Sequence, residues 1–219
     1  MQTGILFEGD FETHVTVSCD DDAVAGLGEW ADRFGLKVTH VVLARGRVRS
    51  QPMVTWVGSG TLDTQRTRAL TVVTDLVSAG YDVTRVKIEA APWTRGVPQT
   101  DAEAVGLGPE YYFEHHVKVL FPAEDELAEL AALVEPHGAH LSWNARRVRE
   151  DGRAERFVTQ RCYRMGDASA VAALSDLRAM LISDGREIVS SEREFVVFDS
   201  DASLDAGWIE GGESGHGGE

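Results

Sequence analysis

Residues 113–119 read Phe-Glu-His-His-Val-Lys-Val and repeat, with few changes, the stretch Phe-Glu-Thr-His-Val-Thr-Val of residues 11–17. Phe, Glu, His and two Val recur in register, and His116 follows His14 by 102 residues. A match at such a spacing is the signature of an internal repeat. We therefore predict that the two halves of the chain share one fold.

Each copy of the stretch alternates between apolar and polar residues, as a half-buried β-strand does. The apolar side chains of the second copy point to one face, whereas Glu114, His116 and Lys118 point to the other. Glu12 and His14 take the corresponding places in the first copy. One face of each strand is suited to a core, and the other carries a carboxylate and an imidazole in a row.

The segments that follow each copy predict the order βαββαβ in both halves. In the first half we expect strands at 11–18, 36–44, 51–57 and 82–90, with helices at 20–34 and 62–78. In the second half we expect strands at 111–121, 140–148, 155–164 and 187–198, with helices at 123–134 and 167–182. Asp20, Thr61 and Asp167 are the expected N-caps. The order is that of the ferredoxin-like unit, so we predict an α+β fold of two tandem units with antiparallel sheets that could close a cleft or a barrel.

The same pattern divides the chain into units at residues 1–90 and 111–199. Residues 91–110 are rich in Gly and Pro, which predicts a linker without helix or strand. Residues 200–219 are rich in Gly and Glu, which predicts a flexible acidic tail. Three apolar residues at the start of this tail could dock before it frays, namely Leu204, Trp208 and Ile209.

Charge and composition narrow the expected partners. The 219-residue chain has a formal net charge of −15, which repels a phosphate backbone and argues against nucleic acid. It shows no signal-peptide pattern and no long apolar run, so we expect a cytoplasmic protein without a membrane partner. Its two cysteines, Cys19 and Cys162, are expected to be free thiols.

The predicted topology concentrates polar side chains on the helix-free face of each sheet. The first and last strands of a ferredoxin-like unit are antiparallel neighbours, which brings His14 toward Glu89 and His116 toward Glu194. The same faces gather further polar candidates: Glu12, Glu114, Lys118, His140, Ser142, Asn144, Arg146 and Glu192. If the two faces meet, they line a cleft or a barrel interior.

Three roles are open for His14 and His116. Each could be a structural imidazole paired with a Glu on a solvated face. Each could be a general acid or base, with Glu89 or Glu194 fixing its tautomer. Each could also be a metal ligand, because one imidazole with two carboxylates suits Mn, Fe or Zn.

The stretch His14-Val15-Thr16-Val17 resembles the His-x-Thr-hydrophobic motif of two-histidine phosphoesterases. Those enzymes use two copies of the motif, with one His as acid and one as base on a phosphodiester. In the second copy of this chain Lys118 stands where the family has Thr or Ser.

The pattern Glu114-x-His116-x-Lys118 resembles the Glu-x-Glu-x-Lys signature of the CYTH superfamily, the triphosphate tunnel enzymes, with His in place of the middle Glu. Further segments of residues 111–198 resemble the later family motifs in the same order: Arg146-Arg147-Val148-Arg149, Thr159-Gln160-Arg161 and Glu192-Arg193-Glu194. The resemblance implies a polar tunnel that binds a phosphorylated anion, with carboxylates holding a divalent metal such as Mg or Mn.

We therefore expect an enzyme that processes a small phosphorylated or otherwise anionic molecule. The alternatives are a His/carboxylate metal-dependent lyase or isomerase for a non-phosphorylated metabolite, and a non-catalytic module that binds a ligand or assembles through a sheet face or edge. The expected roles are catalytic for His116, His14, Glu194 and Glu89, substrate-binding for Lys118, Arg146, Arg161, His140 and Asn144, and metal-ligating for Glu114, Glu192 and Glu12. Because Lys118 and Arg146 concentrate positive charge in the second unit, we expect this unit to carry more of the activity.

Overall fold

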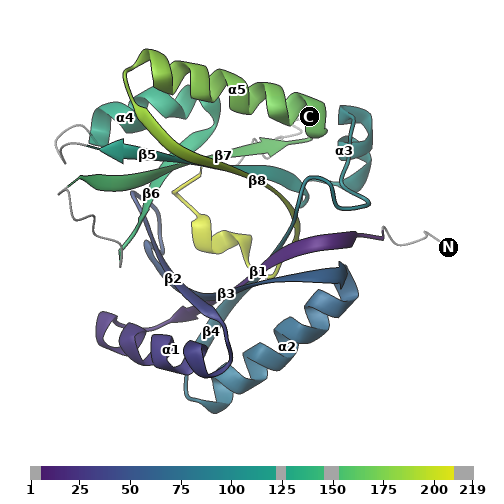
Figure 1. Cartoon of the computed structure of the whole chain (residues 1–219), viewed down its shortest axis with the longest axis vertical. Coiled ribbons are helices and arrows are strands. Elements are labelled where there is room, and N and C mark those ends of the chain that lie inside the picture. The colour runs from purple at the N-terminus through teal and green to yellow at the C-terminus, as the bar shows by residue number, and fades with distance from the viewer. Residues whose placement is uncertain (1–5, 122–126, 146–152, 210–219) are drawn as a thin grey trace, which may run out of the picture.

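The strands of the chain form one antiparallel sheet that closes on itself. The computed structural model describes residues 6–121, 127–145 and 153–209. The strands in these residues are β1 (Glu8–Ser18), β2 (Lys37–Leu43), β3 (Ser50–Thr61), β4 (Asp82–Ala90), β5 (Tyr112–Phe121), β6 (Ala139–Asn144), β7 (Ala154–Tyr163) and β8 (Glu187–Asp199). They close into a barrel in the order β1-β3-β2-β6-β7-β5-β8-β4 (Figure 1).

The barrel is built from two copies of one four-stranded sheet. The first half has the order β4-β1-β3-β2 and the second half has the order β8-β5-β7-β6, which confirms the two ferredoxin-like units. Short seams join the halves, where β2 pairs with β6 and β4 pairs with β8. His14 lies opposite Thr55 of β3, and His116 lies opposite Thr159 of β7. The two histidines therefore hold equivalent places, as the repeat predicts.

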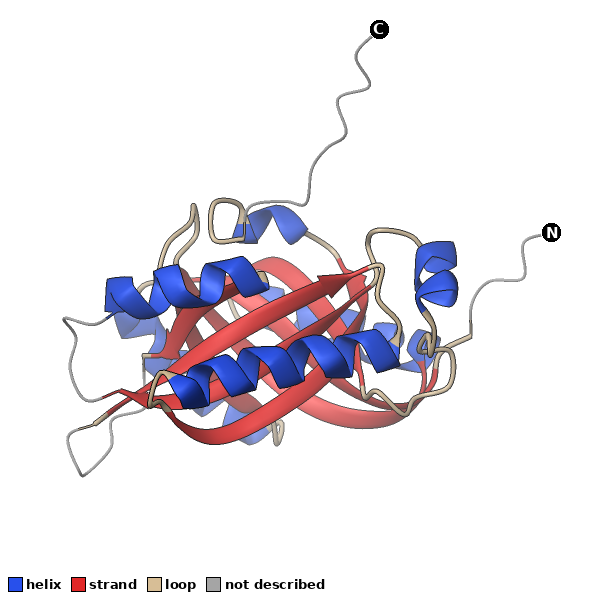
Figure 2. Ribbon diagram, turned by 90° about the horizontal axis from the view of Figure 1, so that it is seen from above, coloured by secondary structure: helices blue, strands red, loops and turns tan. Residues whose placement is uncertain are grey.

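The helices lie outside the barrel. They are α1 (Asp21–Arg33), α2 (Leu62–Ser78), α3 (Asp101–Leu107), α4 (Leu127–Val134) and α5 (Asp167–Ser183). Figure 1 shows α1 and α2 against the outer face of the first half and α4 and α5 against that of the second, and Figure 2 shows helices lying over the outside of the strands. The apolar core lies between the helices and the strands on each side, so the helix-free polar faces line the interior. Within the described residues, none of the helices has the length and apolar character needed to cross a membrane.

Two of the expected N-caps are confirmed and one is wrong. The side chains of Asp20 and Thr61 accept hydrogen bonds from backbone N–H groups three residues on, at 2.9 and 3.2 Å. At α5 the N-cap is Gly166, and Asp167 is the first helical residue. The N–H of Gly166 donates instead to Asp101 Oδ1 at 2.8 Å. A carboxylate from a distant segment thus satisfies this helix end, which local sequence could not indicate.

Asp101 belongs to α3, a helix in the segment that we expected to contain none. Thr100 and Glu103 form a capping box around its first turn. The side chain of Thr100 accepts from the N–H of Glu103 at 3.4 Å, and Glu103 Oε2 accepts from the N–H of Thr100 at 3.0 Å. The Thr-x-x-Glu pattern is a known helix-start signal, so the sequence contained the evidence that the Gly and Pro content obscured.

The segment after β8 closes one end of the barrel. Leu204 and Trp208 are buried, and the indole N–H of Trp208 donates to the carbonyl of Leu141 at 2.9 Å. In Figure 1 this segment, in yellow, lies between the two halves of the barrel. The docking of Leu204 and Trp208 is confirmed, so residues 201–209 are not the free tail that composition suggested. Residues 210–219 lie outside the described residues.

The two cysteines make no disulfide. Cys162 is buried in the core between β7 and its neighbours, and Cys19 is partly exposed at the end of β1. Burial raises the pKa of the Cys162 thiol to about 11, which keeps it protonated and unreactive at neutral pH. The prediction that neither cysteine forms a disulfide is confirmed.

Candidate functional site

The polar interior of the barrel encloses a cavity of about 240 Å³. Its lining includes most of the residues that the sequence singled out: Glu12, His14, Glu89, Glu114, His116, Lys118, Asn144, Arg161, Glu192 and Glu194. A second hollow, of about 780 Å³, shares Glu12, Glu89, Glu192 and Glu194 with the first and is bordered by the exposed Trp93. The interior therefore leads to an acidic opening at the end opposite to Trp208, and we call this opening the mouth.

His14 is held at both ring nitrogens. Its Nδ1 forms a hydrogen bond with Thr55 Oγ1 at 2.9 Å, and its Nε2 lies 2.9 Å from Glu89 Oε2. β1 and β3 place His14 beside Thr55, while Glu89 comes from β4 on the other side. Both distances are those of ordinary hydrogen bonds, so this imidazole is fully engaged.

His116 is fixed at one nitrogen and only loosely engaged at the other. Its Nδ1 forms a hydrogen bond with Thr159 Oγ1 at 3.0 Å, which matches His14 and Thr55. Its Nε2 lies 3.4 Å from Glu114 Oε1 and 3.4 Å from Glu194 Oε2. Both distances exceed the usual N–H···O range of about 2.7–3.2 Å. His116 therefore faces two carboxylates without making a close bond to either.

The carboxylates control the protonation of both histidines. Burial opposes the charge on His116, but the nearby carboxylates of Glu114 and Glu194 outweigh it and raise its pKa to about 10. Burial likewise opposes the charge on His14, and Glu89 reverses the effect and raises its pKa. Burial would raise the pKa of Glu89, but Lys87 and His14 lower it to about 2. At neutral pH His116 is protonated and Glu89 is ionised.

A chain of buried ion pairs runs from the histidines toward the closed end. Lys87 Nζ lies 2.7 Å from Glu89 Oε1 and 2.6 Å from Glu114 Oε1. Arg161 Nε donates to Glu114 Oε2 at 2.5 Å, and its Nη2 donates to Asp205 Oδ2 at 2.6 Å. Because burying a charge is costly unless it is paired, these groups depend on one another.

Asp205 and Arg85 complete this network, and the sequence analysis missed both. Arg85 donates to Asp205 Oδ2 at 3.0 Å and to both oxygens of Asp199 at 2.8 and 2.5 Å. Gln51 donates to Asp205 Oδ1 at 3.0 Å. Arg85 was detectable, since it precedes Lys87 and Glu89 at strand spacing. Asp205 lies outside both repeats, and no pattern in the chain pointed to it.

The cations expected to bind a substrate anion already have carboxylate neighbours. Arg161 contacts Glu114 and Asp205, and Lys118 Nζ lies 3.8 Å from Glu155. Asn144 lines the cavity, whereas His140 lies beyond Trp208 in a small separate pocket. Arg146 lies outside the described residues.

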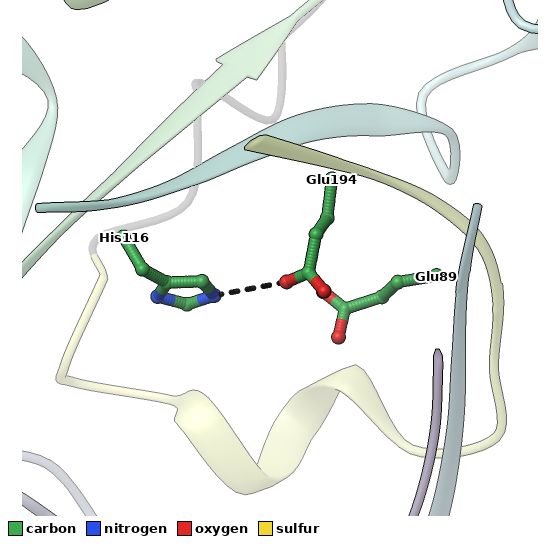
Figure 3. Close-up of side chains that lie close together, drawn as sticks. All are labelled: Glu89, His116 and Glu194. Carbon is green, nitrogen blue, oxygen red and sulfur yellow. Dashed lines mark ion pairs between the residues drawn. The ribbon is translucent and has the colours of Figure 1, made fainter. Parts of the chain in front are cut away.

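Three side chains could hold a metal ion together. One ligand atom each from Glu89, His116 and Glu194 lies within 4.8 Å of the others, and Figure 3 shows the three converging from different strands. The expected metal ligands were others. Glu114 is taken up by Lys87 and Arg161, and Glu12 lines the mouth with Glu192. The metal-capable group therefore consists of residues that the sequence assigned to catalysis.

Comparison with known proteins gives no family. No family model matches the chain, and no curated protein matches it. Two solved structures align over most of their length. The small subunit of acetolactate synthase from Thermotoga maritima shares 10% identity over 87% of this chain and 95% of its own, with a TM-score of 0.33. A protein assigned as a monooxygenase from Fusobacterium nucleatum subsp. nucleatum shares 8% identity over 93% of this chain and 97% of its own, with a TM-score of 0.31. At these scores neither likeness carries an argument about function.

Proposed function

We propose that the chain is an enzyme of the lyase or isomerase type that acts on a small, polar, non-phosphorylated molecule inside the barrel. The observation that carries the proposal is the placement of His14 and His116. Both line one cavity, each is fixed at Nδ1 by a threonine hydroxyl, and each presents Nε2 to a glutamate. A pair of oriented imidazole and carboxylate groups in a confined space is suited to moving protons on a bound substrate.

The charge balance of the interior favours a non-phosphorylated substrate. A phosphate group needs unpaired Arg or Lys side chains that can bind its oxygens. Arg161 and Lys87 instead contact buried carboxylates at 2.5–2.7 Å. The mouth carries Glu12, Glu192 and Glu194, whose charges repel a dianion on its way in. A phosphohydrolase, which the sequence led us to expect, fits this interior less well.

The side chains divide naturally into positioning groups and proton-transfer groups. Thr55 and Thr159 orient the two imidazoles by binding Nδ1. His116 lies between two carboxylates at 3.4 Å and has the looser contacts, so a substrate oxygen could replace one of them. His116 with Glu194 would then give or take the proton, a role that typically contributes roughly 10²–10⁴-fold to a rate.

A paired ligand screen tests this proposal. Thermal-shift measurements would compare small hydroxy acids, keto acids and amino acids with phosphorylated compounds of the same carbon skeleton. A ligand present at about 100 times its Kd stabilises a protein by about 2.7 kcal/mol, which a melting curve resolves. We expect stabilisation by non-phosphorylated members of the pairs.

Proton transfer is then measured directly. Proton NMR in D₂O should show exchange or elimination at a carbon-bound hydrogen of the bound compound, and His116→Gln should slow it by at least 100-fold. Binding restricted to the phosphorylated members would favour a phosphohydrolase instead. Binding without exchange or turnover would favour a non-catalytic binding module.

A further inference from the structure

The strongest feature outside the acid–base argument is the arrangement of ligand atoms around His116 Nε2. The edge of a tetrahedral site with bonds of about 2.1 Å is about 3.4 Å long. His116 Nε2 and Glu194 Oε2 are 3.4 Å apart, too far for a good hydrogen bond but suited to two ligands of one ion. Glu89, from a third strand, brings the third ligand atom, an oxygen, within 4.8 Å of the other two.

We infer that Glu89, His116 and Glu194 form a binding site for a divalent transition-metal ion of the zinc or manganese type. The inference goes beyond the proposed function, because an ion would displace the proton from His116 Nε2. His116 would then be a ligand in the metal-bound protein and a proton-transfer group only in the metal-free protein. One imidazole with two carboxylates is a mixed nitrogen and oxygen set, which suits Zn²⁺, Mn²⁺ or Fe²⁺ better than Mg²⁺ or Ca²⁺. Three protein ligands leave positions open for a substrate oxygen, as in catalytic metal sites.

The second shell supports this assignment. A histidine that binds a metal through one ring nitrogen usually donates a hydrogen bond through the other. His116 Nδ1 has that partner in Thr159 Oγ1 at 3.0 Å, which leaves Nε2 directed toward Glu194 and the cavity. Among the described side chains Glu194 has no ion pair other than that with His116, and it lines the mouth. It can therefore turn toward an ion without breaking a second interaction.

Glu89 is the anchor of the site. It is almost completely buried, and Lys87 and His14 contact one oxygen each. A carboxylate has about four acceptor positions on its two oxygens, so Glu89 can keep both contacts and still bind an ion. Lys87 and His14 would hold it in place, which is the role of outer-shell partners at known metal sites.

The equivalent position in the first half provides a matched control. His14 has the same Nδ1 partner type, Thr55, but its Nε2 is closed by Glu89 at 2.9 Å. No metal-capable group within the described residues is centred on His14. The site should therefore depend directly on His116 and Thr159, and much less on Thr55, which contacts no ligand.

Isothermal titration of the metal-free protein with Zn²⁺ tests the inference without a substrate. A His216→Ala background removes the histidine of the C-terminal residues as a competing ligand. We expect one tight Zn²⁺ per chain, weakened at least 10-fold by Glu194→Ala and by His116→Ala. Thr159→Val should weaken it about 10-fold, and Thr55→Val should change it less than about 3-fold.

Circular dichroism and melting curves establish that each variant is folded. If His116→Ala does not fold, Glu194→Ala and Thr159→Val still decide the question. The absence of a tight site in the parent protein would overturn the inference, as would equal losses in Thr55→Val and Thr159→Val. Neither result would affect the substrate screen and NMR exchange of the proposed function, which need no added metal, so the two failures are distinguishable.

Discussion

The two halves of the barrel have the same backbone but place different charges around the same glutamate. Glu114 lies opposite Arg161 on the neighbouring strand, whereas Glu12 lies opposite Val57. Glu114 is therefore locked into the buried network. Glu12 makes no ion pair among the described residues, and burial raises its pKa. The residue opposite each glutamate thus determines its state. Arg161 on β7 holds Glu114 in the network, whereas Val57 on β3 leaves Glu12 available at the mouth.

The two histidines also differ in the contacts of their Nε2 atoms. Each unit gives its histidine one threonine and a glutamate on the last strand. In the first half Glu89 lies close to His14, with Oε2 at 2.9 Å from His14 Nε2. In the second half Glu114 and Glu194 share His116 at 3.4 Å each. The two histidines thus hold equivalent positions in the repeat. Hydrogen bonds occupy both ring nitrogens of His14, whereas Nε2 of His116 has no close partner.

The largest expected effect comes from removing the paired glutamate. Glu114→Ala leaves Lys87 and Arg161 buried without their shared carboxylate, so we expect a loss of about 3–5 kcal/mol in the free energy of unfolding. Glu12→Ala removes a carboxylate without an ion pair and should cost about 1 kcal/mol or less. Urea denaturation of both variants measures the difference. Similar losses would contradict the asymmetry between the halves.

A smaller effect is expected at the closed end, where Asp205 binds Arg85, Arg161 and Gln51. Asp205→Asn keeps the shape and removes the charge, so we expect a loss of roughly 1–3 kcal/mol. Trp208 should become more accessible to a fluorescence quencher, because the segment that carries it is held by these contacts. Asp201→Asn, at the half-buried start of the same segment, is the control and should change neither quantity appreciably, because asparagine can accept the same hydrogen bond from the N–H of Ser203.

The same carboxylate predicts a pH dependence. Burial would raise the pKa of Asp205, but Arg85 and Arg161 outweigh it and lower the pKa below its ordinary value. Its contribution to stability is therefore complete above that ordinary value, near pH 4, and is lost as the pH falls through the folded-state pKa. The stability difference between the parent protein and Asp205→Asn should be constant near neutral pH and shrink below about pH 4. A constant difference down to pH 2 would contradict this assignment.

The smallest effect is expected when Glu12 is given an arginine on the neighbouring strand, as Glu114 has in Arg161. Val57 is 75% exposed, so Val57→Arg has room for its side chain beside Glu12. The pair is partly exposed, and we expect a gain of about 1 kcal/mol or less together with a lower pKa for Glu12. NMR titration of the Glu12 carboxyl measures the pKa. An unchanged value would mean that the position opposite Glu12 does not determine its state.

Much of the fold followed from local pattern. The repeat, the strand alternation and the turn residues predicted every strand and the helices that flank them, because each of these signals acts within a few residues. Closure of the barrel could not be predicted, since it depends on the seams between β2 and β6 and between β4 and β8. The cap of α5 and the docking of Asp205 are likewise contacts between segments that are distant in sequence.

The sequence predicted which residues line the candidate site, but not which of them form ion pairs with one another. Alternation placed the Glu/His rows on the interior face, and the structure puts seven of their Glu and His side chains around one cavity. Which charges neutralise each other depends on distances across the barrel. Arg161 was expected to bind a substrate anion, but Glu114 lies 2.5 Å away and Asp205 2.6 Å away. Sequence alone does not supply such pairings.

The most direct test of the central claim, that His116 is the open histidine and His14 the closed one, is a long-range ¹H–¹⁵N spectrum of the imidazoles with and without Zn²⁺. We predict that Nε2 of His116 changes its chemical shift as it binds the ion, while Nδ1 keeps its hydrogen bond to Thr159. Both nitrogens of His14 should keep their shifts, because Thr55 and Glu89 already occupy them. A change at His14 equal to that at His116, or no change at either, would contradict the account.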